Sequence, residues 1–356
     1  MRRVLLAVVA VVLTATTAAA QAARELLYVC IQDEAKVAVI DMATGELLRT
    51  VDLQTLGFPA TAKPHYIVVE PDRAHWYVSL IGAGRVVKFD AQDRVVAQYE
   101  METPGMLALV PGSQQLLVSR SMSAVNPPAR VALLDRRTMR GEELPVLFPR
   151  PHPMAATAAG YAYTGSLGVN QLATIDLATE RVSLTAVSGP THSLVQYDVS
   201  ADGKTLVASS ETTGRLLVFD LSAPATPTLL TQVTVGAMAF DPSFTPDQRH
   251  VWVPVKGSSE IVVIETGTWK EVRRLTHASF QQPHQIIFSA DGRRAFVTNN
   301  NKMDHMADPN AHAGHAGHAG GDGVASLSIV DVASGTVTSA LVLGKNLTGM
   351  GTRARR

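Results

Sequence analysis

The sequence repeats one pattern seven times, and this repeat constrains the fold more than any other feature. A short apolar run ends in an acidic residue at Asp41, Asp90, Asp135, Asp176, Asp220, Glu265 and Asp331. Successive steps are 49, 45, 41, 44, 45 and 66 residues. A second apolar run precedes each one. In five repeats a marker residue in this run lies eleven positions before the acid: Cys30, Ser79, Gly165, Ser209 and Pro254. Such regular spacing indicates repeated structural units.

Each repeat supplies four short strands. The last repeat shows them as "HQIIFS", "AFVTN", "LSIVD" and "VTSALVL", with turns at "ADGRR" and "ASG". Valine, isoleucine, leucine and aromatic residues fill the strands, and Asp-Gly or Ser-Gly pairs separate them. Four strands in a period of 40–50 residues are typical of a β-propeller blade. We therefore predict an all-β, seven-bladed β-propeller of four-stranded antiparallel blades.

The first repeat lacks an innermost strand, because the run that begins at Glu25 already corresponds to a second strand. The C-terminal stretch "GKNLTGMGTRARR" is placed to supply it. We predict that this stretch closes the ring, and the alternative is a frayed tail beside an incomplete first blade.

Two stretches resemble the YVTN (YncE-like) family of bacterial β-propeller repeats. They are "LYVCIQDEAKVAVIDMATGELLRTVDL" and "AFVTNNN…SLSIVDVASGTVTSALVLG". In that family a "YVTN" strand is followed by a "V-x-VID-x-x-T/S-G" strand and turn, and the resemblance covers essentially the whole chain after residue 22. It implies the propeller fold. Related propellers serve as binding modules, lactonase-like enzymes and haem d1 carriers, so the resemblance assigns no single function.

The N-terminal stretch "MRRVLLAVVAVVLTATTAAAQA" has two arginines, an apolar core and a small-residue A-x-A site at residues 20–22. These features predict a secretory signal peptide over residues 1–22, cleaved after Ala22, followed by one propeller domain over 23–356. We expect a periplasmic or secreted protein. The apolar core of the predicted signal peptide is too short to cross a bilayer comfortably, and no later stretch approaches membrane-spanning length.

The charge balance and the cysteine content limit the classes of partner that we expect for this protein. The chain has 31 basic and 31 acidic residues, and this balance argues against nucleic acid as a partner. A single cysteine, Cys30, rules out an intrachain disulfide, and the absence of a CxxCH motif rules out covalent c-type haem. A metal ion, a small ligand or another exported protein remain as partners.

Three histidines follow a proline at the start of predicted inner strands: His65 in "KPHYIVV", His152 in "RPHPMAA" and His284 in "QPHQIIF". They belong to blades two, four and seven, close to threefold spacing around the ring. Such imidazoles could converge on one zinc or copper ion at the channel mouth, with His192 of blade five nearby. The alternative is structural: proline starts the strand, and the imidazole bonds a neighbouring backbone carbonyl.

A histidine-rich insertion at residues 302–323 lengthens the connection between the second and third strands of the last blade. It carries His305, His312, His315 and His318, with Met303 and Met306. Imidazole suits copper, zinc and nickel, and thioether favours Cu(I). The connection should emerge on the face where the inner strands begin. It is either a metal-capturing loop or a solvated low-complexity loop.

Two functions remain from different classes. The first is an exported binding or scaffold propeller that holds copper or zinc at the channel mouth. The second is a lactonase-like hydrolase that uses the same face. A minor third alternative is a haem d1-related carrier, for which Arg150 is the arginine best placed to contact an anionic tetrapyrrole. Neither Glu70 nor Asp241 belongs to a recognisable catalytic set, and no nucleophile elbow, phosphate-binding glycine loop or zincin motif is present. We therefore favour a binding protein over an enzyme.

Overall fold

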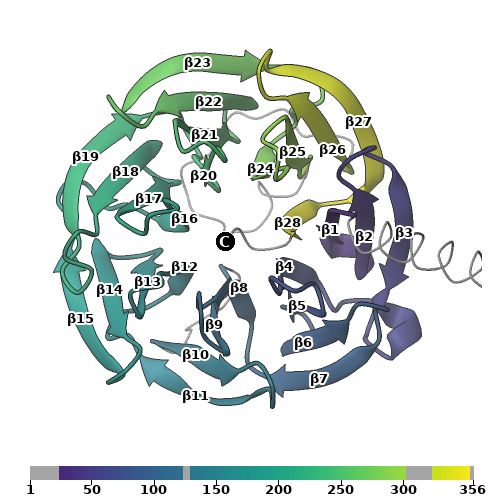
Figure 1. The fold of residues 1–356 in the computed structure, drawn as a ribbon, viewed down its shortest axis with the longest axis horizontal. Helices are drawn as coiled ribbons and strands as arrows, with labels where there is room; N and C mark the ends of the chain where they lie inside the picture. Colours follow the sequence, from purple (N-terminus) through teal and green to yellow (C-terminus); the bar gives the residue numbers. More distant parts are fainter. Residues whose placement is uncertain (1–23, 123–128, 302–322, 353–356) are drawn as a thin grey trace, which may run out of the picture.

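Seven four-stranded antiparallel sheets form a ring with their innermost strands around a common axis, which we call the channel (Figure 1). The computed structural model describes residues 24–122, 129–301 and 323–352. The predicted seven-bladed β-propeller is confirmed. The predicted signal peptide at 1–22 lies outside the described residues, and so does the histidine-rich insertion apart from Gly323.

Each blade runs from an innermost strand at the channel to an outermost strand, and blade one contains both the first and the last described strand, β1 and β28. Blade one comprises β28 (Leu347–Gly351), β1 (Leu26–Ile31), β2 (Lys36–Asp41) and β3 (Leu47–Asp52). Blade two comprises β4 (Pro64–Val69), β5 (His75–Leu80), β6 (Arg85–Asp90) and β7 (Val95–Glu100). Blade three comprises β8 (Pro104–Leu109), β9 (Gln115–Arg120), β10 (Arg130–Asp135) and β11 (Arg140–Pro145). Blade four comprises β12 (Pro151–Ala156), β13 (Tyr161–Ser166), β14 (Gln171–Asp176) and β15 (Arg181–Ala186).

The remaining blades follow the same order. Blade five comprises β16 (Leu194–Val199), β17 (Thr205–Ser210), β18 (Arg215–Asp220) and β19 (Thr228–Thr234). Blade six comprises β20 (Ser243–Phe244), β21 (His250–Val255), β22 (Glu260–Glu265) and β23 (Lys270–Thr276). Blade seven comprises β24 (Pro283–Phe288), β25 (Arg294–Asn299), β26 (Val324–Asp331) and β27 (Thr336–Lys345). Two short 3-10 helices, η1 (Gln32–Glu34) and η2 (Leu53–Leu56), flank strands of blade one.

Burial follows each strand's place in its blade. The second and third strands are almost continuously buried, as in β5 and β6, because neighbouring blades cover both faces of the sheet. Outer strands are more exposed, and β7 alternates between half-buried and exposed residues because only one of its faces meets a neighbouring blade. The core therefore consists of apolar layers between blades.

The repeated acidic residues form the turns after the third strands. One carboxylate oxygen of Asp41 accepts the amide of Ala43 at 2.8 Å, and Asp220 accepts the amide of Ser222 at the same distance. Hydrogen bonds from Ser222 lower the pKa of Asp220. These acids are turn formers, as their repetition indicates.

The C-terminal strand closes the ring, as predicted. Strand β28 pairs antiparallel with β1, with Val29 opposite Met350 and Ile31 opposite Leu347. Its glycines allow close packing against blade two, because a Cβ on Gly349 would lie 2.3 Å from the carbonyl oxygen of His65. Blade one is thus complete only when the last and first strands of the chain meet.

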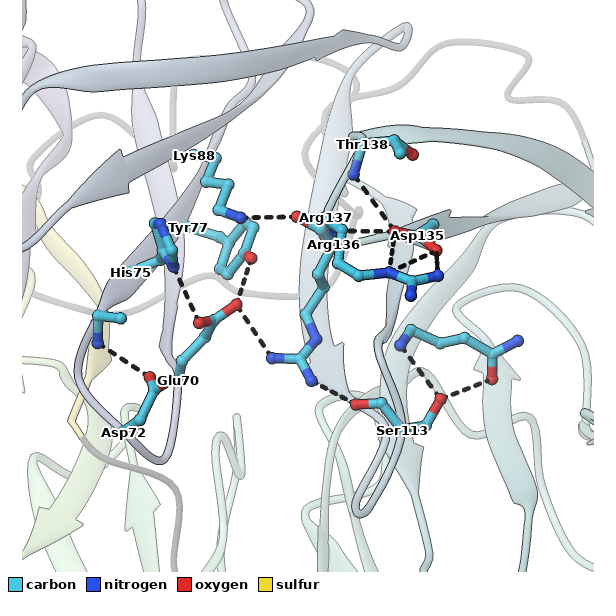
Figure 2. Close-up of polar contacts among 12 residues, drawn as sticks. Glu70, Asp72, His75, Tyr77, Lys88, Ser113, Asp135, Arg136, Arg137 and Thr138 are labelled. Atoms are coloured by element: carbon cyan, nitrogen blue, oxygen red, sulfur yellow. Dashed lines mark hydrogen bonds and ion pairs between the residues drawn. The ribbon is translucent and has the colours of Figure 1, made fainter.

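A buried ion pair joins blades two and three (Figure 2). One carboxylate oxygen of Glu70 accepts from Arg136 at 3.0 Å and from the Tyr77 hydroxyl at 2.6 Å, and the other lies 3.0 Å from Nδ1 of His75. Lys88 donates to the Arg136 carbonyl at 2.7 Å. These contacts give Glu70 a structural role between blades, consistent with the absence of a catalytic pattern around it.

Shortening a buried side chain of the closing strand β28 tests how much ring closure contributes to stability. Leu347 is fully buried, so Leu347→Ala is expected to lower the free energy of unfolding by about 2–5 kcal/mol. The control is Val342→Ala on outer strand β27, where the side chain is 70% exposed and the change should stay within about 0.5 kcal/mol. Denaturant unfolding curves measure both. Equally small losses for the two variants would mean that β28 contributes little to closure.

Candidate functional site

Candidate ligand-binding side chains gather where the inner strands begin. The first residues of these strands pair with the last residues of the second strands, as Pro64 does with Leu80 and Pro151 with Ser166. Residues just before the inner strands and just after the second strands therefore meet at one end of the channel. We call this end the histidine mouth, defined by His65, His152, His284, Arg150, Glu211 and Lys256.

His65 is held in one orientation by a neighbouring blade. Its Nδ1 lies 3.0 Å from the side-chain oxygen of Gln32, in the connection that follows β1. An amide oxygen only accepts hydrogen bonds, so Nδ1 carries the proton and Nε2 keeps its lone pair. This Nε2 is buried and has no hydrogen-bond partner within the described residues. Burial first, then His152 and Lys256, lower the pKa of His65 to about 3.

His152 has the same arrangement. It is 2% exposed, and its Nδ1 donates to the carbonyl of Arg120 at 2.9 Å. Burial lowers the pKa of His152 to about 4, although the bond to the Arg120 carbonyl acts in the opposite direction. Both imidazoles are therefore neutral at neutral pH, with Nε2 as the acceptor nitrogen.

The two imidazoles lie close together. Their ring centroids are 6.3 Å apart, and the ring planes are inclined by 39°. Two imidazoles that each place a nitrogen about 2 Å from a shared ion have centroids roughly 5 Å apart at a tetrahedral angle and roughly 6.3 Å apart in linear coordination. The His65–His152 spacing is that of the linear arrangement.

The other two predicted propeller histidines, His284 and His192, contact other residues. His284 packs on Phe240 with 5.1 Å between ring centroids, and Lys256 Nζ lies 3.9 Å from the Phe240 centroid. His192 is fully buried in blade five, with Nδ1 2.8 Å from the Thr213 hydroxyl and Nε2 3.3 Å from the Ser188 carbonyl. Both of its ring nitrogens are engaged by the protein.

No three His, Cys, Asp or Glu side chains form a metal-holding group within residues 24–122, 129–301 and 323–352. His65 and His152 are neighbours, whereas the ring next to His284 is that of Phe240, which Lys256 Nζ also contacts. Four further metal candidates, His305, His312, His315 and His318, lie outside the described residues.

The sequence motifs identify only some of the charged groups around the pair. Arg150 contributes to lowering the pKa of His152, and Glu211 in turn acts on Arg150. Lys256 is 6% exposed and acts on His65. Glu211 and Lys256 occupy the same place in their repeats as Gln32, two positions after the second-strand marker residue. Following that position around all seven repeats would have found them.

Comparison with known proteins supports the fold. No protein-family model matches the chain, and no curated protein matches it. A solved protein of unknown function from Desulfotomaculum acetoxidans is similar with a TM-score of 0.72 and 16% identity, over 92% of this chain and 98% of that one. A putative 6-phosphogluconolactonase from Bacteroides fragilis gives 0.67 and 15%, over 93% and 98%. The dihydro-haem d1 dehydrogenase NirN, solved in complex with DHE, gives 0.60 and 17%, over 91% and 74%.

These likenesses are to seven-bladed β-propellers and, at such low identities, they establish the fold alone. Within the described part of the chain, no helix combines the length and apolar character that a membrane crossing requires.

The depressed pKa values of the histidine pair predict a pH-dependent stability. In the unfolded chain each histidine binds a proton near pH 6.5, whereas the folded protein resists protonation until about pH 3 for His65 and about pH 4 for His152. Their contribution is complete above pH 6.5 and is lost as the pH falls, with a slope of up to about 1.4 kcal/mol per pH unit for each histidine.

Denaturant unfolding at several values between pH 7.5 and 4.5 measures this slope. His152→Gln should lose stability less steeply with falling pH than the unmodified protein. Exposed His277→Gln serves as the control and should follow the unmodified protein. Parallel curves for His152→Gln and the unmodified protein would show that this histidine titrates normally in the fold.

Proposed function

We propose that this protein is an exported, YVTN-like binding propeller that holds a transition metal at the histidine mouth through His65 and His152. The observation that carries the proposal is the paired geometry. Two neutral imidazoles lie beside each other, each with Nδ1 bonded to an oxygen, and the Nε2 of His65 is buried without a partner in the described chain.

A metal ion would satisfy that nitrogen. A buried polar atom without a hydrogen bond costs about 1–3 kcal/mol, and coordination would remove this cost. In metal-binding histidines the N–H of the other ring nitrogen commonly donates a hydrogen bond to an oxygen, and this bond sets the ring orientation and the basicity of the ligand. Gln32 and the Arg120 carbonyl are placed to do this for His65 and His152.

Copper(I) fits the pair better than zinc. Zinc sites take three or four protein ligands, and the described part of the mouth brings two imidazoles, His65 and His152, next to each other. Lys256 and Arg150 add positive charge nearby, and that charge disfavours a divalent ion more than a monovalent one. Zinc binding would draw further ligands from the insertion, where His305, His312, His315 and His318 are the candidates.

Titration with Cu(I) under reducing conditions and with Zn²⁺ tests this assignment. After deletion of residues 303–322, about one equivalent of Cu(I) should still bind, while zinc binding should be lost. His65→Ala or His152→Ala should abolish Cu(I) binding in the deletion variant, and exposed His277→Ala should leave it intact. Loss of all Cu(I) binding on deletion would place the metal in the insertion and overturn the proposal for the mouth.

An anionic tetrapyrrole of the haem d1 type is a second candidate ligand. The specific observation is that the charges of Arg150 and Lys256 act on His152 and His65 and lower their pKa values, and such cations would pair with the carboxylates of a tetrapyrrole. Structural likeness to NirN, solved with its DHE ligand, adds fold-level support. No comparable set of residues supports the lactonase-like alternative in the described mouth.

Lys256→Gln separates the two ligands by the sign of its effect. Removing a cation near His65 should raise the affinity for Cu(I), because repulsion of the metal falls. The same change should lower the affinity for an anionic tetrapyrrole, measured by titrating haem and following its visible absorption. Glu142→Gln on outer strand β11 is the matched surface control. Weaker Cu(I) binding in Lys256→Gln would contradict the metal assignment.

A further inference from the structure

The opposite end of the channel holds a cavity of about 750 Å³. Its wall is formed by the last residues of inner strands, including Val69, Leu109, Ala156, Val199 and Phe288. The volume lies within the range of about 300–1,000 Å³ that is usual for small-molecule sites. We call it the acidic cavity because of two groups that line it, Asp198 and Asp241.

The cavity combines apolar walls with polar groups toward the channel centre. Leu109, Ile287 and Met350 contribute apolar surface. Tyr66 and Gln285 also line the cavity, and the Gln285 amide donates to the Tyr66 hydroxyl at 3.2 Å. A ligand with an apolar body and one polar end matches this distribution.

Two hydrogen-bond acceptors at the acidic cavity, the Asp241 carboxylate and the neighbouring Gln196 amide oxygen, have few donors within the protein. Asp241 is 6% exposed, and its carboxylate accepts a long hydrogen bond of 3.4 Å from the Gln196 amide nitrogen. No arginine, lysine or histidine of the described chain forms an ion pair with it. The oxygen of the same Gln196 amide is buried without a hydrogen-bond partner among the described residues.

The neighbouring Asp198 makes this region more acidic. Its carboxylate accepts the amides of Val199 at 2.9 Å and Phe244 at 2.8 Å, which fix it beside the cavity. Burial, followed by the charge of Asp198, raises the pKa of Asp241 well above its ordinary value. A cationic group with N–H donors beside Asp241 would offset the cost of burying the charged carboxylate.

We propose that the acidic cavity binds an organic cation, with an ammonium or guanidinium group at Asp241 and an apolar body against the cavity walls. This site shares no lining side chain with the histidine mouth, although the backbone amide of Asp241 donates to the carbonyl of His284 at 3.3 Å. It lies at the other end of the channel, and its chemistry is opposite: acidic acceptors instead of imidazoles flanked by cations.

The cationic group has two sources that share this chemistry. One is a free amine or guanidine ligand. The other is the chain itself, since three of the last four residues, 353–356, are arginines and directly follow Thr352, which lines the cavity. A chain that ends at Thr352 distinguishes the two.

The probes are phenethylamine and its neutral counterpart 2-phenylethanol, titrated by calorimetry against the full chain and the chain ending at Thr352. The shortened chain should bind phenethylamine at least tenfold more tightly than 2-phenylethanol. Weaker phenethylamine binding by the full chain identifies the arginine tail as an occupant, and equal binding identifies an external cation. Comparable binding of the amine and the alcohol, or no binding of the amine, would overturn the proposal.

Substitutions at Asp241 test whether its carboxyl group is responsible for phenethylamine binding. Asp241→Asn keeps the side-chain shape and should reduce phenethylamine affinity at least tenfold, whereas Glu142→Gln on the outer strand should not change it. Circular dichroism verifies folding, and Asp241→Ser replaces Asp241→Asn if the latter does not fold. Unchanged affinity in the folded Asp241 variant would contradict the assignment. Copper binding at the histidine mouth should persist in this variant, so failure of one site is distinguishable from failure of the other.

Discussion

The pairing of the last strand with the first is the interaction on which the rest of the structure depends. Strand β28 completes blade one and also packs against the inner strand of blade two (Figure 1). A Cβ on Gly351 would lie 2.6 Å from the Ile67 side chain, so glycine is needed for this approach. Both ends of the channel are assembled from several blades, and only a closed ring holds them at fixed distances.

Much of this architecture can be predicted from the sequence because it follows from repetition. The spacing of apolar runs defines the blades, and the missing first strand in blade one identifies the role of the C-terminal stretch. Repeat position also explains the turn-forming role of Asp41 and Asp220. Period and strand pattern act locally, so a single sequence is sufficient to recognise them.

The candidate sites are less predictable because they depend on contacts between repeats. The position of His65 follows from its repeat. Gln32 of another blade engages Nδ1 of His65 and leaves its Nε2 without a partner in the described chain, and this contact cannot be read from the repeat. His284 has the same sequence context as His65 and His152, yet it packs on Phe240. Asp241 becomes notable only when its burial, its neighbour Asp198 and the adjoining cavity are known. Side-chain direction and pairing across blades are absent from the repeat pattern.

The channel therefore has two ends of different character. At the histidine mouth, neutral imidazoles offer lone pairs beside Lys256 and Arg150. At the opposite end, carboxyl groups face an apolar-walled cavity. Tyr66 and Gln285, contributed by blades two and seven, bond to each other between the inner strands. One propeller can in this way present two separate binding chemistries along a single axis.

X-ray absorption spectroscopy of Cu(I) bound to the protein lacking residues 303–322 would show directly whether the histidine mouth holds a metal. We expect two imidazole nitrogen ligands on one copper ion, and the loss of that signal when both His65 and His152 are replaced by alanine. A copper environment dominated by sulfur, or an unchanged spectrum in the double variant, would contradict the assignment of the metal to the His65–His152 pair.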